Sequence, residues 1–167
     1  MLTGDTLLAA VQNVGVNKLD QFLTVSTAVK IDPGASTAVT ATFTLANHTP
    51  RGEPGYIAGT GVAHVPPDTY LALVTLTMPG SASDVLVDGK AVANDAGFDG
   101  PTRVVAVLRP VAPGSDVHVA VSFTLPGAHG RLQIESAARL PSATVSLATS
   151  SASVTKAADD TRPAVTW

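Results

Sequence analysis

The chain has 167 residues, which is the length of about one domain and is enough to bury a core without metals or disulfides. Apolar residues make up 45% of it and charged residues 14%, with a formal net charge of −3, so the composition excludes an intrinsically disordered chain. It has no cluster of Lys and Arg with which to bind nucleic acid or an anionic membrane surface. The absence of cysteine excludes disulfides, thiolate zinc sites and thiol nucleophiles.

The first predicted element is a short helix over residues 5–13. Asp5 can cap it, and Leu7, Leu8 and Val11 fall on one helical face. The apolar stretch within it, residues 7–11, is too short to span a bilayer, so we expect no membrane-spanning segment in this chain.

Apolar residues recur at every second position from residue 23, which predicts strands over residues 23–31 and 39–45. Asp32-Pro33-Gly34 supplies the Pro and Gly of a tight turn, so these strands should form a hairpin. Residues 47–69 are rich in Pro and Gly without any sustained period, and they predict a long loop.

Residues 70–78 are almost continuously apolar, as in a central strand that is covered on both faces. Asp88-Gly89 lies between two apolar runs and predicts a tight hairpin over residues 85–92. A polar loop follows at residues 94–100. Further strands are expected over residues 103–108, 117–125, 131–136 and 144–148.

These elements predict an all-β fold, an antiparallel β-sandwich of the immunoglobulin-like or jelly-roll-like kind, with a short N-terminal helix. The expected organisation is a helix and linker at residues 1–22, the sandwich at 23–148 and a disordered tail at 149–167, where the periodicity is lost. The pattern leaves the strand order open.

The loops at residues 47–69 and 94–100 are the expected interaction sites, because long loops in compact domains are usually functional. An aromatic side chain exposed in a loop can anchor a partner. The candidate binding residues are Tyr56, Ile57, His64 and Phe98. The alternative is that the aromatic residues cover the ends of the sandwich.

Four aspartates cluster in sequence around the predicted hairpin and the loop after it: Asp84, Asp88, Asp95 and Asp99. Calcium is coordinated by six to eight oxygens, so loop carboxylates of this kind are a candidate calcium site. The residue order of a calcium-binding EF-hand loop is absent, and Asp88 and Asp95 also suit ordinary turns.

Catalytic chemistry has no recognisable motif in the chain. G-x-S-x-G, a compact Ser/His/Asp grouping and a Gly-rich phosphate loop are all missing. The four histidines do not have the close spacing that brings metal ligands together on one strand or helix. We therefore expect no catalytic residues, no cofactor and no enzymatic activity.

The segment from Asn13 to Leu23, with Asn17-Lys18-Leu19-Asp20 at its centre, resembles the N-x-G-x-N-K-L-D-x-x-L transition of an uncharacterised family of actinobacterial membrane-anchored envelope proteins. The similarity continues through residues 38–47 and the stretch Pro54-Gly55-Tyr56-Ile57. In that family the transition leads into a C-terminal β-sandwich. The resemblance implies an extracytoplasmic location and a chain excised from a longer protein, and it brings no catalytic residues with it.

The resulting functional prediction is a non-catalytic extracytoplasmic structural or interaction domain of a cell-envelope protein, with a protein or an envelope glycan as its partner. The alternative is a self-assembling subunit of a surface fibre or of a virion, such as a capsid decoration or tail protein. In that case the ends of the chain, residues 1–15 and 142–167, would dock onto neighbouring copies, since few charges protect the edges of its sheets.

Overall fold

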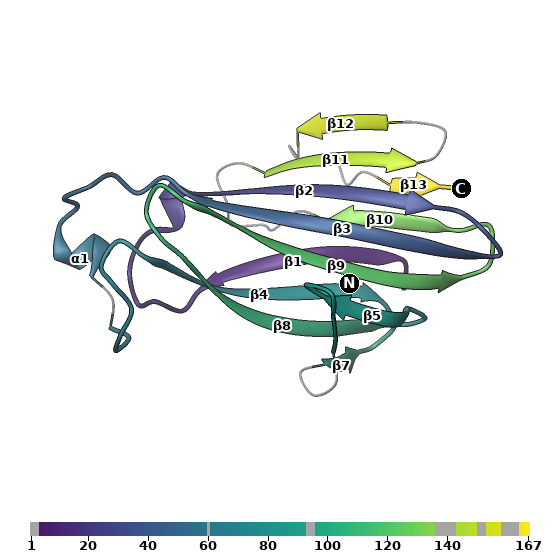
Figure 1. The fold of residues 1–167 in the computed structure, drawn as a ribbon, viewed down its shortest axis with the longest axis horizontal. Coiled ribbons are helices and arrows are strands. Elements are labelled where there is room, and N and C mark those ends of the chain that lie inside the picture. Colours follow the sequence, from purple (N-terminus) through teal and green to yellow (C-terminus); the bar gives the residue numbers. More distant parts are fainter. Residues whose placement is uncertain (1–3, 60, 93–95, 136–142, 150–152, 158–163) are drawn as a thin grey trace.

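The computed structural model describes residues 4–59, 61–92, 96–135, 143–149, 153–157 and 164–167. Over these residues the chain forms two β-sheets that pack face to face, with one short α-helix at one end (Figure 1). The predicted β-sandwich is confirmed.

The first sheet has β1 and β4 at its centre and β13 and β7 at its edges. In spatial order its strands are β13 (Ala164–Thr166), β10 (Arg131–Glu135), β1 (Thr6–Asn13), β4 (Tyr70–Pro79), β8 (Thr102–Val111) and β7 (Ala96–Asp99).

The second sheet is built around a long meander of three strands, β2, β3 and β9. In spatial order it contains β12 (Ser153–Ala157), β11 (Ala143–Thr149), β2 (Leu23–Asp32), β3 (Ser36–Asn47), β9 (Asp116–Pro126), β5 (Ser83–Val87) and β6 (Lys90–Ala91). A single 3₁₀ turn, η1 (Asp20–Phe22), precedes β2, and the helix α1 (Gly55–Ala58) lies between β3 and β4.

Most neighbouring strands are antiparallel, but two pairs are parallel: β1 with β10, and β2 with β11. The expectation of a purely antiparallel sandwich is therefore corrected at these pairs. Parallel neighbours cannot be joined by a tight turn. In both pairs the partners come from opposite ends of the chain, so no local sequence pattern marks them.

The core lies between the sheets and follows the predicted alternation. In β3, Val39, Ala41, Phe43 and Leu45 are buried, while Thr40 between them is exposed. The same period of two buries Val119, Val121, Phe123 and Leu125 of β9, and Leu23, Val25, Val29 and Ile31 of β2. β4 is buried along nearly its whole length, as expected for a central strand.

The helix predicted over residues 5–13 is wrong, because Thr6–Asn13 is the strand β1. β1 pairs with β4 on one side and with β10 on the other, and it buries Leu7 and Ala9 in the core. Leu7, Leu8 and Val11 suit a helical face, but a continuous apolar run equally suits a strand in the middle of a sheet. Pairing with β4 and β10 on its two sides is what makes Thr6–Asn13 a strand rather than a helix.

Two further segments differ from the sequence expectation. Ala96–Asp99, within the predicted polar loop, is the edge strand β7 and pairs with β8. In the predicted disordered tail, Ser153–Ala157 pairs with β11 and Ala164–Thr166 pairs with β10. In each case the partner strand supplies backbone hydrogen bonds to a sequence with little strand pattern of its own.

The tight hairpin at Asp88-Gly89 is confirmed. Its two central residues have φ angles of 50° and 74°, as a type I′ turn requires, and β5 pairs with β6 on either side of it.

Among the described residues, no helix is both long enough and apolar enough to cross a membrane.

Candidate interaction surfaces

A network of buried amides holds the loops at the α1 end of the sandwich. Asn47, at the end of β3, is 1% exposed, and its amide nitrogen donates to the backbone oxygens of Asp68 and Val111, each at 2.9 Å. Its oxygen accepts hydrogen bonds from the backbone N–H and the hydroxyl of Thr49. One side chain thereby joins β3, β8 and both ends of the 48–69 connection, so this loop is anchored rather than loose.

A second pair of amides shapes the turn after β1. The Asn13 side chain accepts a hydrogen bond from the Gly15 N–H at 2.9 Å and donates to Asn17 Oδ1 at 2.7 Å. Asn17 in turn donates to the backbone oxygen of Thr69 at 3.0 Å. Between them Val16 has a φ of 59° and is 77% exposed. A β-branched residue in the left-handed region is strained, so the surrounding hydrogen bonds must impose this conformation.

The Asn17-Lys18-Leu19-Asp20 segment is used to attach this turn to the rest of the fold. The Lys18 N–H donates to the Ile57 oxygen at 2.9 Å, and Leu19 is completely buried. Asp20 accepts a hydrogen bond from the hydroxyl of the buried Tyr70 at 2.9 Å. Burial raises the pKa of the Tyr70 hydroxyl well above its usual value, and the hydrogen bond to Asp20 and the negative charge of Asp20 raise it further.

Three side chains project to solvent from this rigid base, and we call Val16, Lys18 and Tyr56 the end surface. Tyr56 lies in α1 and is 71% exposed, and Lys18 Nζ is 5.7 Å from the centre of its ring. That distance is within the range of a cation–π contact. Val16 lies over Gly61 of the same connection, because a Cβ on Gly61 would be 3.3 Å from Val16 Cβ.

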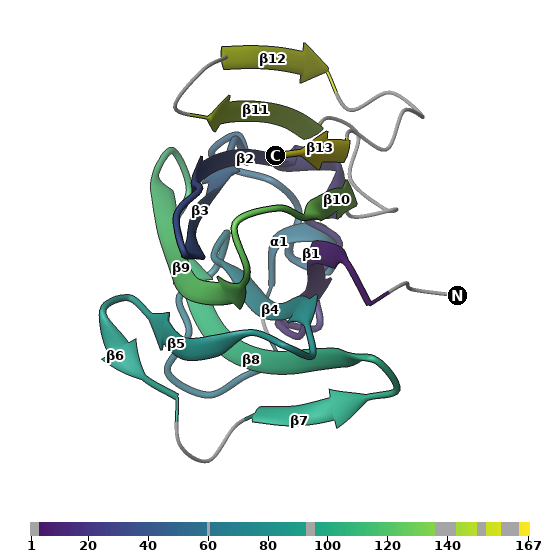
Figure 2. The same cartoon turned by 90° about the vertical axis from the view of Figure 1, so that its right-hand side faces the viewer.

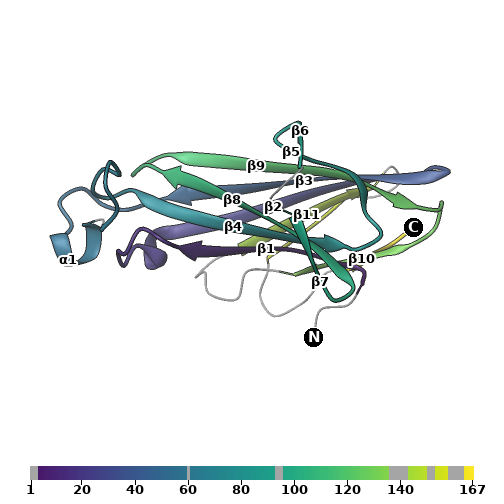
Figure 3. The same ribbon diagram turned by 90° about the horizontal axis from the view of Figure 1, so that it is seen from below.

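The predicted binding residues divide between two places. Tyr56 and Ile57 are neighbours in α1, but Ile57 is partly buried and packs against the core, so only Tyr56 faces solvent fully. His64 is exposed on the same connection, with a φ of 65°. Phe98 is 73% exposed on the edge strand β7, away from α1 (Figure 3). The structure therefore does not combine the two predicted loops into one surface.

The predicted calcium ligands are also spread over different elements. Asp84 lies in β5 and accepts a hydrogen bond from the Ser83 hydroxyl, whereas Asp99 is exposed at the end of β7 in the other sheet. Asp95 lies outside the described residues. Within the described part of the chain, no three His, Asp or Glu side chains are grouped so that they could hold a metal ion.

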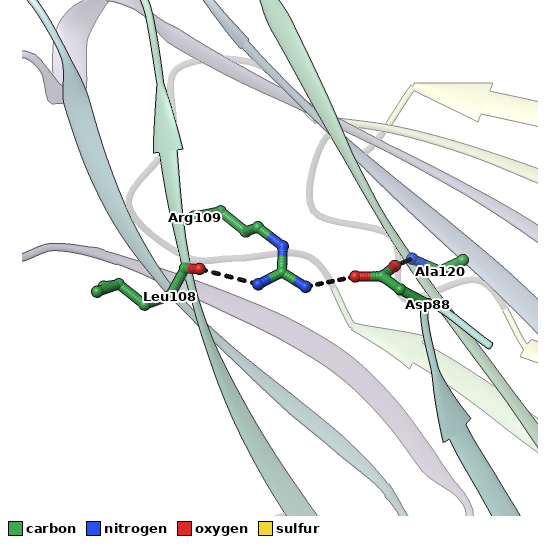
Figure 4. A network of polar contacts seen from close by, with 4 residues as sticks. All are labelled: Asp88, Leu108, Arg109 and Ala120. Atoms are coloured by element: carbon green, nitrogen blue, oxygen red, sulfur yellow. Dashed lines mark hydrogen bonds and ion pairs between the residues drawn. The ribbon is translucent and has the colours of Figure 1, made fainter. Parts of the chain in front are cut away.

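Asp88 has a structural role at the open edge of the sandwich. Its carboxylate accepts a hydrogen bond from the Ala120 N–H of β9 at 2.9 Å and forms an ion pair with Arg109 of β8, which also donates to the Leu108 oxygen (Figure 4). Asp88 and Ala120 belong to the second sheet and Arg109 to the first, so this contact joins the sheets where the β5–β6 hairpin lies beside β8 (Figure 2).

Opposing effects act on the pKa of the Asp88 carboxyl group. Burial raises it, but the hydrogen bonds from Ala120 and Arg109 and the positive charges of Arg109 and Lys90 lower it by more in total. A surface cavity of about 290 Å³ lies beside this contact, with Val92, Val105 and Val107 among its lining residues. Both oxygens of Asp88 are already engaged by protein groups, which favours a structural role over metal binding.

Sequence reasoning missed Val16 and Lys18 as parts of a surface. Val16 stands out only because its backbone is left-handed. Lys18 stands out only because the fold brings it close to Tyr56, which is far from it in the sequence. The one available signal was local: Asn13 and Asn17 flank Gly15, and Asn side chains commonly bond to their own backbone in turns.

No protein-family model matches the chain, and no curated protein matches its sequence. Among solved structures, a proposed nutrient-binding protein of Legionella pneumophila is 10% identical with a TM-score of 0.45, over 83% of this chain and 55% of that one. An M1 zinc metallopeptidase of Deinococcus radiodurans is 11% identical with a TM-score of 0.29, over 84% and 32% of the two chains. The chain thus spans about half of the first protein and a third of the second.

Proposed function

We propose that this chain is a non-catalytic interaction domain of a cell-envelope protein, located outside the cytoplasm, and that it binds a protein or an envelope glycan through the end surface. The observation that carries the proposal is an aromatic side chain, Tyr56, that is 71% exposed on a fixed backbone. An aromatic residue that is held in place before binding loses little conformational entropy when it contacts a partner, and such residues dominate many interfaces.

The rigidity of the end surface comes from backbone and amide hydrogen bonds. Three hydrogen bonds tie the turn after β1 and the 48–69 connection to each other and to the strands. The Lys18 N–H donates to the Ile57 oxygen, the Asn17 side chain to the Thr69 oxygen and the Asn47 side chain to the Asp68 oxygen. Strain at an exposed residue such as Val16 is a further sign of a functional position. The envelope location is supported by the resemblance of Asn17-Lys18-Leu19-Asp20 and its surroundings to actinobacterial envelope proteins.

The test is cosedimentation of the purified chain with cell-wall sacculi and with membrane vesicles prepared from an actinobacterium. Binding to either fraction is expected, and Tyr56→Ala should weaken it about tenfold or more, as for an interface hot spot. Phe98→Ala is the matched control, because Phe98 is equally exposed but lies on β7.

Equal binding by Tyr56→Ala and the unmodified chain would reject the end surface. Hydrolysis of cell-wall or ester substrates by the purified chain, if abolished by a single substitution, would reject the non-catalytic role itself.

A second candidate function, a self-assembling subunit of a fibre or virion, is favoured by a different observation. The last described strands, β12 and β13, each form one of the two edges of their sheets. An edge strand presents unpaired backbone groups with which another copy can continue the sheet.

A further inference from the structure

The segment Ala164–Trp167 lies on β10 as an added strand. Its register places Ala164 opposite Gln133 and Thr166 opposite Arg131. Beyond β13, the backbone N–H of Gly130 donates to the Trp167 oxygen, and the N–H of Trp167 donates to the Gly130 oxygen, each at 3.1 Å. The final described residues of the chain are thus held by a short run of main-chain hydrogen bonds, as in the binding of a peptide to a sheet edge.

Gly130 provides the space for the indole ring of Trp167. A Cβ atom on Gly130 would lie 2.7 Å from Trp167 Cζ2 and 3.2 Å from Cε2, which is closer than carbon atoms pack. The ring is partly buried and packs against the hydrophobic core to which Leu132 and Ile134 of β10 belong. The site therefore combines a strand edge, a glycine at the position of the ring and an apolar surface.

Two features make this docking easy to open. β13 is only three residues long, so few backbone hydrogen bonds hold it. The indole Nε1 of Trp167 is buried without a hydrogen-bond partner among the described residues, which costs free energy in the docked state. Segments with few buried contacts at the edge of a fold open locally at a small fraction of the global unfolding free energy.

The receiving strand is fixed independently of the segment that it receives. β10 pairs with β1 on its other side, the Gln133 N–H donates to the Asp5 oxygen at 2.8 Å, and Arg131 forms an ion pair with Asp5. When Ala164–Trp167 leaves, the edge of β10 stays in place with its backbone groups unpaired, ready to bind an equivalent segment.

We propose that the β10 edge at Gly130 is a binding site for the Ala164–Trp167 segment of a second copy of this chain, so that copies associate by exchanging this segment. The occupant is identified by the fit of the chain's own segment in the site. The inference rests on the self-assembly candidate and makes it specific, and it does not involve the end surface. Exchange of an identical element needs no new contact, because the one formed within a chain is formed between chains.

The test mixes two full-length variants that each lack one half of the contact. Trp167→Ala retains the receiving edge but has no indole, and Gly130→Val retains the segment but has no room for the ring. Each variant alone should sediment as a monomer at concentrations where the mixture forms a one-to-one complex. A mixture that sediments as two monomers overturns the proposal.

A second measurement uses a synthetic peptide with the sequence of residues 161–167 and does not depend on folding of the Gly130→Val chain. The protein has one tryptophan, so Trp167→Ala has none, and any tryptophan emission then comes from the peptide. We expect a saturable blue shift of that emission, with binding weakened about tenfold or more by Gly130→Ala in the Trp167→Ala chain. The proposed site is rejected if the peptide emission does not shift, or if Gly130→Ala leaves the binding of the peptide unchanged.

Tyr56→Ala, introduced into both full-length variants, serves as the control that separates the two proposals. It should leave the one-to-one complex unchanged even where it abolishes envelope binding. Loss of the complex in that background would show that association depends on the end surface and would overturn segment exchange.

Discussion

Val16 shows how a single residue can be placed against its own preference. Its left-handed backbone, with a φ of 59°, is held by Asn13 and Asn17 on either side. Replacing it with glycine removes the strain, since glycine adopts this conformation freely. We expect Val16→Gly to raise the free energy of unfolding by about 1 kcal/mol in urea denaturation while weakening binding through the end surface.

The matched control for this prediction is Val14→Gly, two residues earlier. Val14 is partly buried and its backbone is not left-handed, so glycine there should lower the free energy of unfolding by about 1 kcal/mol. If both glycine variants were destabilised alike, the conformation at Val16 would carry no strain.

Tyr70 gives a prediction at alkaline pH. Its folded-state pKa is raised, first by burial and then by Asp20, so the hydroxyl stays protonated in the fold while an unfolded tyrosine ionises near pH 10. The unfolded state therefore binds fewer protons above that pH, and the free energy of unfolding should fall as the pH rises past about 10.

Removing the Tyr70 hydroxyl should remove that dependence. Tyr70→Phe loses one hydrogen bond to Asp20, at a cost of about 1 kcal/mol near neutral pH, and its urea-unfolding free energy should fall less steeply above pH 10 than that of the unmodified chain. If the unfolding free energies of Tyr70→Phe and of the unmodified chain fell in parallel between about pH 9 and pH 11, the pH dependence would not come from Tyr70.

At the scale of elements, the β5–β6 hairpin depends on Asp88 twice. The residue adopts the left-handed backbone of the turn, and its carboxylate bonds to Ala120 of β9 and to Arg109 of β8. The pKa of Asp88 is lowered in the fold, so its contribution to stability is present above the unfolded value near 4 and is lost as the pH falls through the folded value.

Asp88→Asn tests this contribution. The variant should be less stable than the unmodified chain at pH 7, and the difference should shrink as the pH is lowered from about 5 towards 2, measured by urea denaturation at each pH. Asp99→Asn, at an exposed site on β7, should leave stability within about 0.5 kcal/mol at pH 7. If the difference in unfolding free energy between Asp88→Asn and the unmodified chain did not change with pH, the charge of Asp88 would not be the source of its contribution to stability.

At the scale of the whole molecule, alternation was enough to predict the sandwich and most of its interior. β3 and β9 expose and bury residues with a period that only a strand can use, and their buried positions are those expected. The pairing of distant segments was beyond such reasoning, because a local pattern contains no information about which strand lies alongside. β1 was therefore missed as a strand, and the parallel pairings of β1 with β10 and of β2 with β11 were missed, although β10 and β11 were themselves predicted as strands.

The candidate surface was predictable to a similar degree. Tyr56 lies in a Pro- and Gly-rich stretch where the sequence allowed either an exposed aromatic anchor or an aromatic residue covering the end of the sandwich; in the structure it stands in the short helix α1 and is 71% exposed. Lys18 reaches Tyr56, and Val16 reaches Gly61 of the same connection, because Asn17 and Lys18 bond to residues far along the chain, at Thr69 and Ile57. Asp88 was read as a turn residue or a calcium ligand, and its pairing with Arg109 across the two sheets could not be anticipated from either position.

The place of β1 leads to a prediction about the smallest chain that folds. If residues 1–13 were an added helix, a chain starting at Val14 would keep its sandwich. In the structure β1 lies between β4 and β10 and contributes Leu7 and Ala9 to the core, so its removal leaves two unpaired edges and an open core. Truncating one buried Leu alone costs about 2–5 kcal/mol, against total stabilities of roughly 5–15 kcal/mol.

We therefore expect the chain starting at Val14 to lose cooperative thermal unfolding and near-ultraviolet circular dichroism. A chain starting at Gly4, which keeps β1 entire, should retain both signals. If the chain starting at Val14 unfolded cooperatively at the same temperature as the unmodified chain, the two sheets would be able to pack without β1, a central strand of the first sheet, and residues 1–13 would not be needed for folding. The unpaired edges of β4 and β10 argue against that outcome, since nothing else in the described part of the chain is adjacent to both of them.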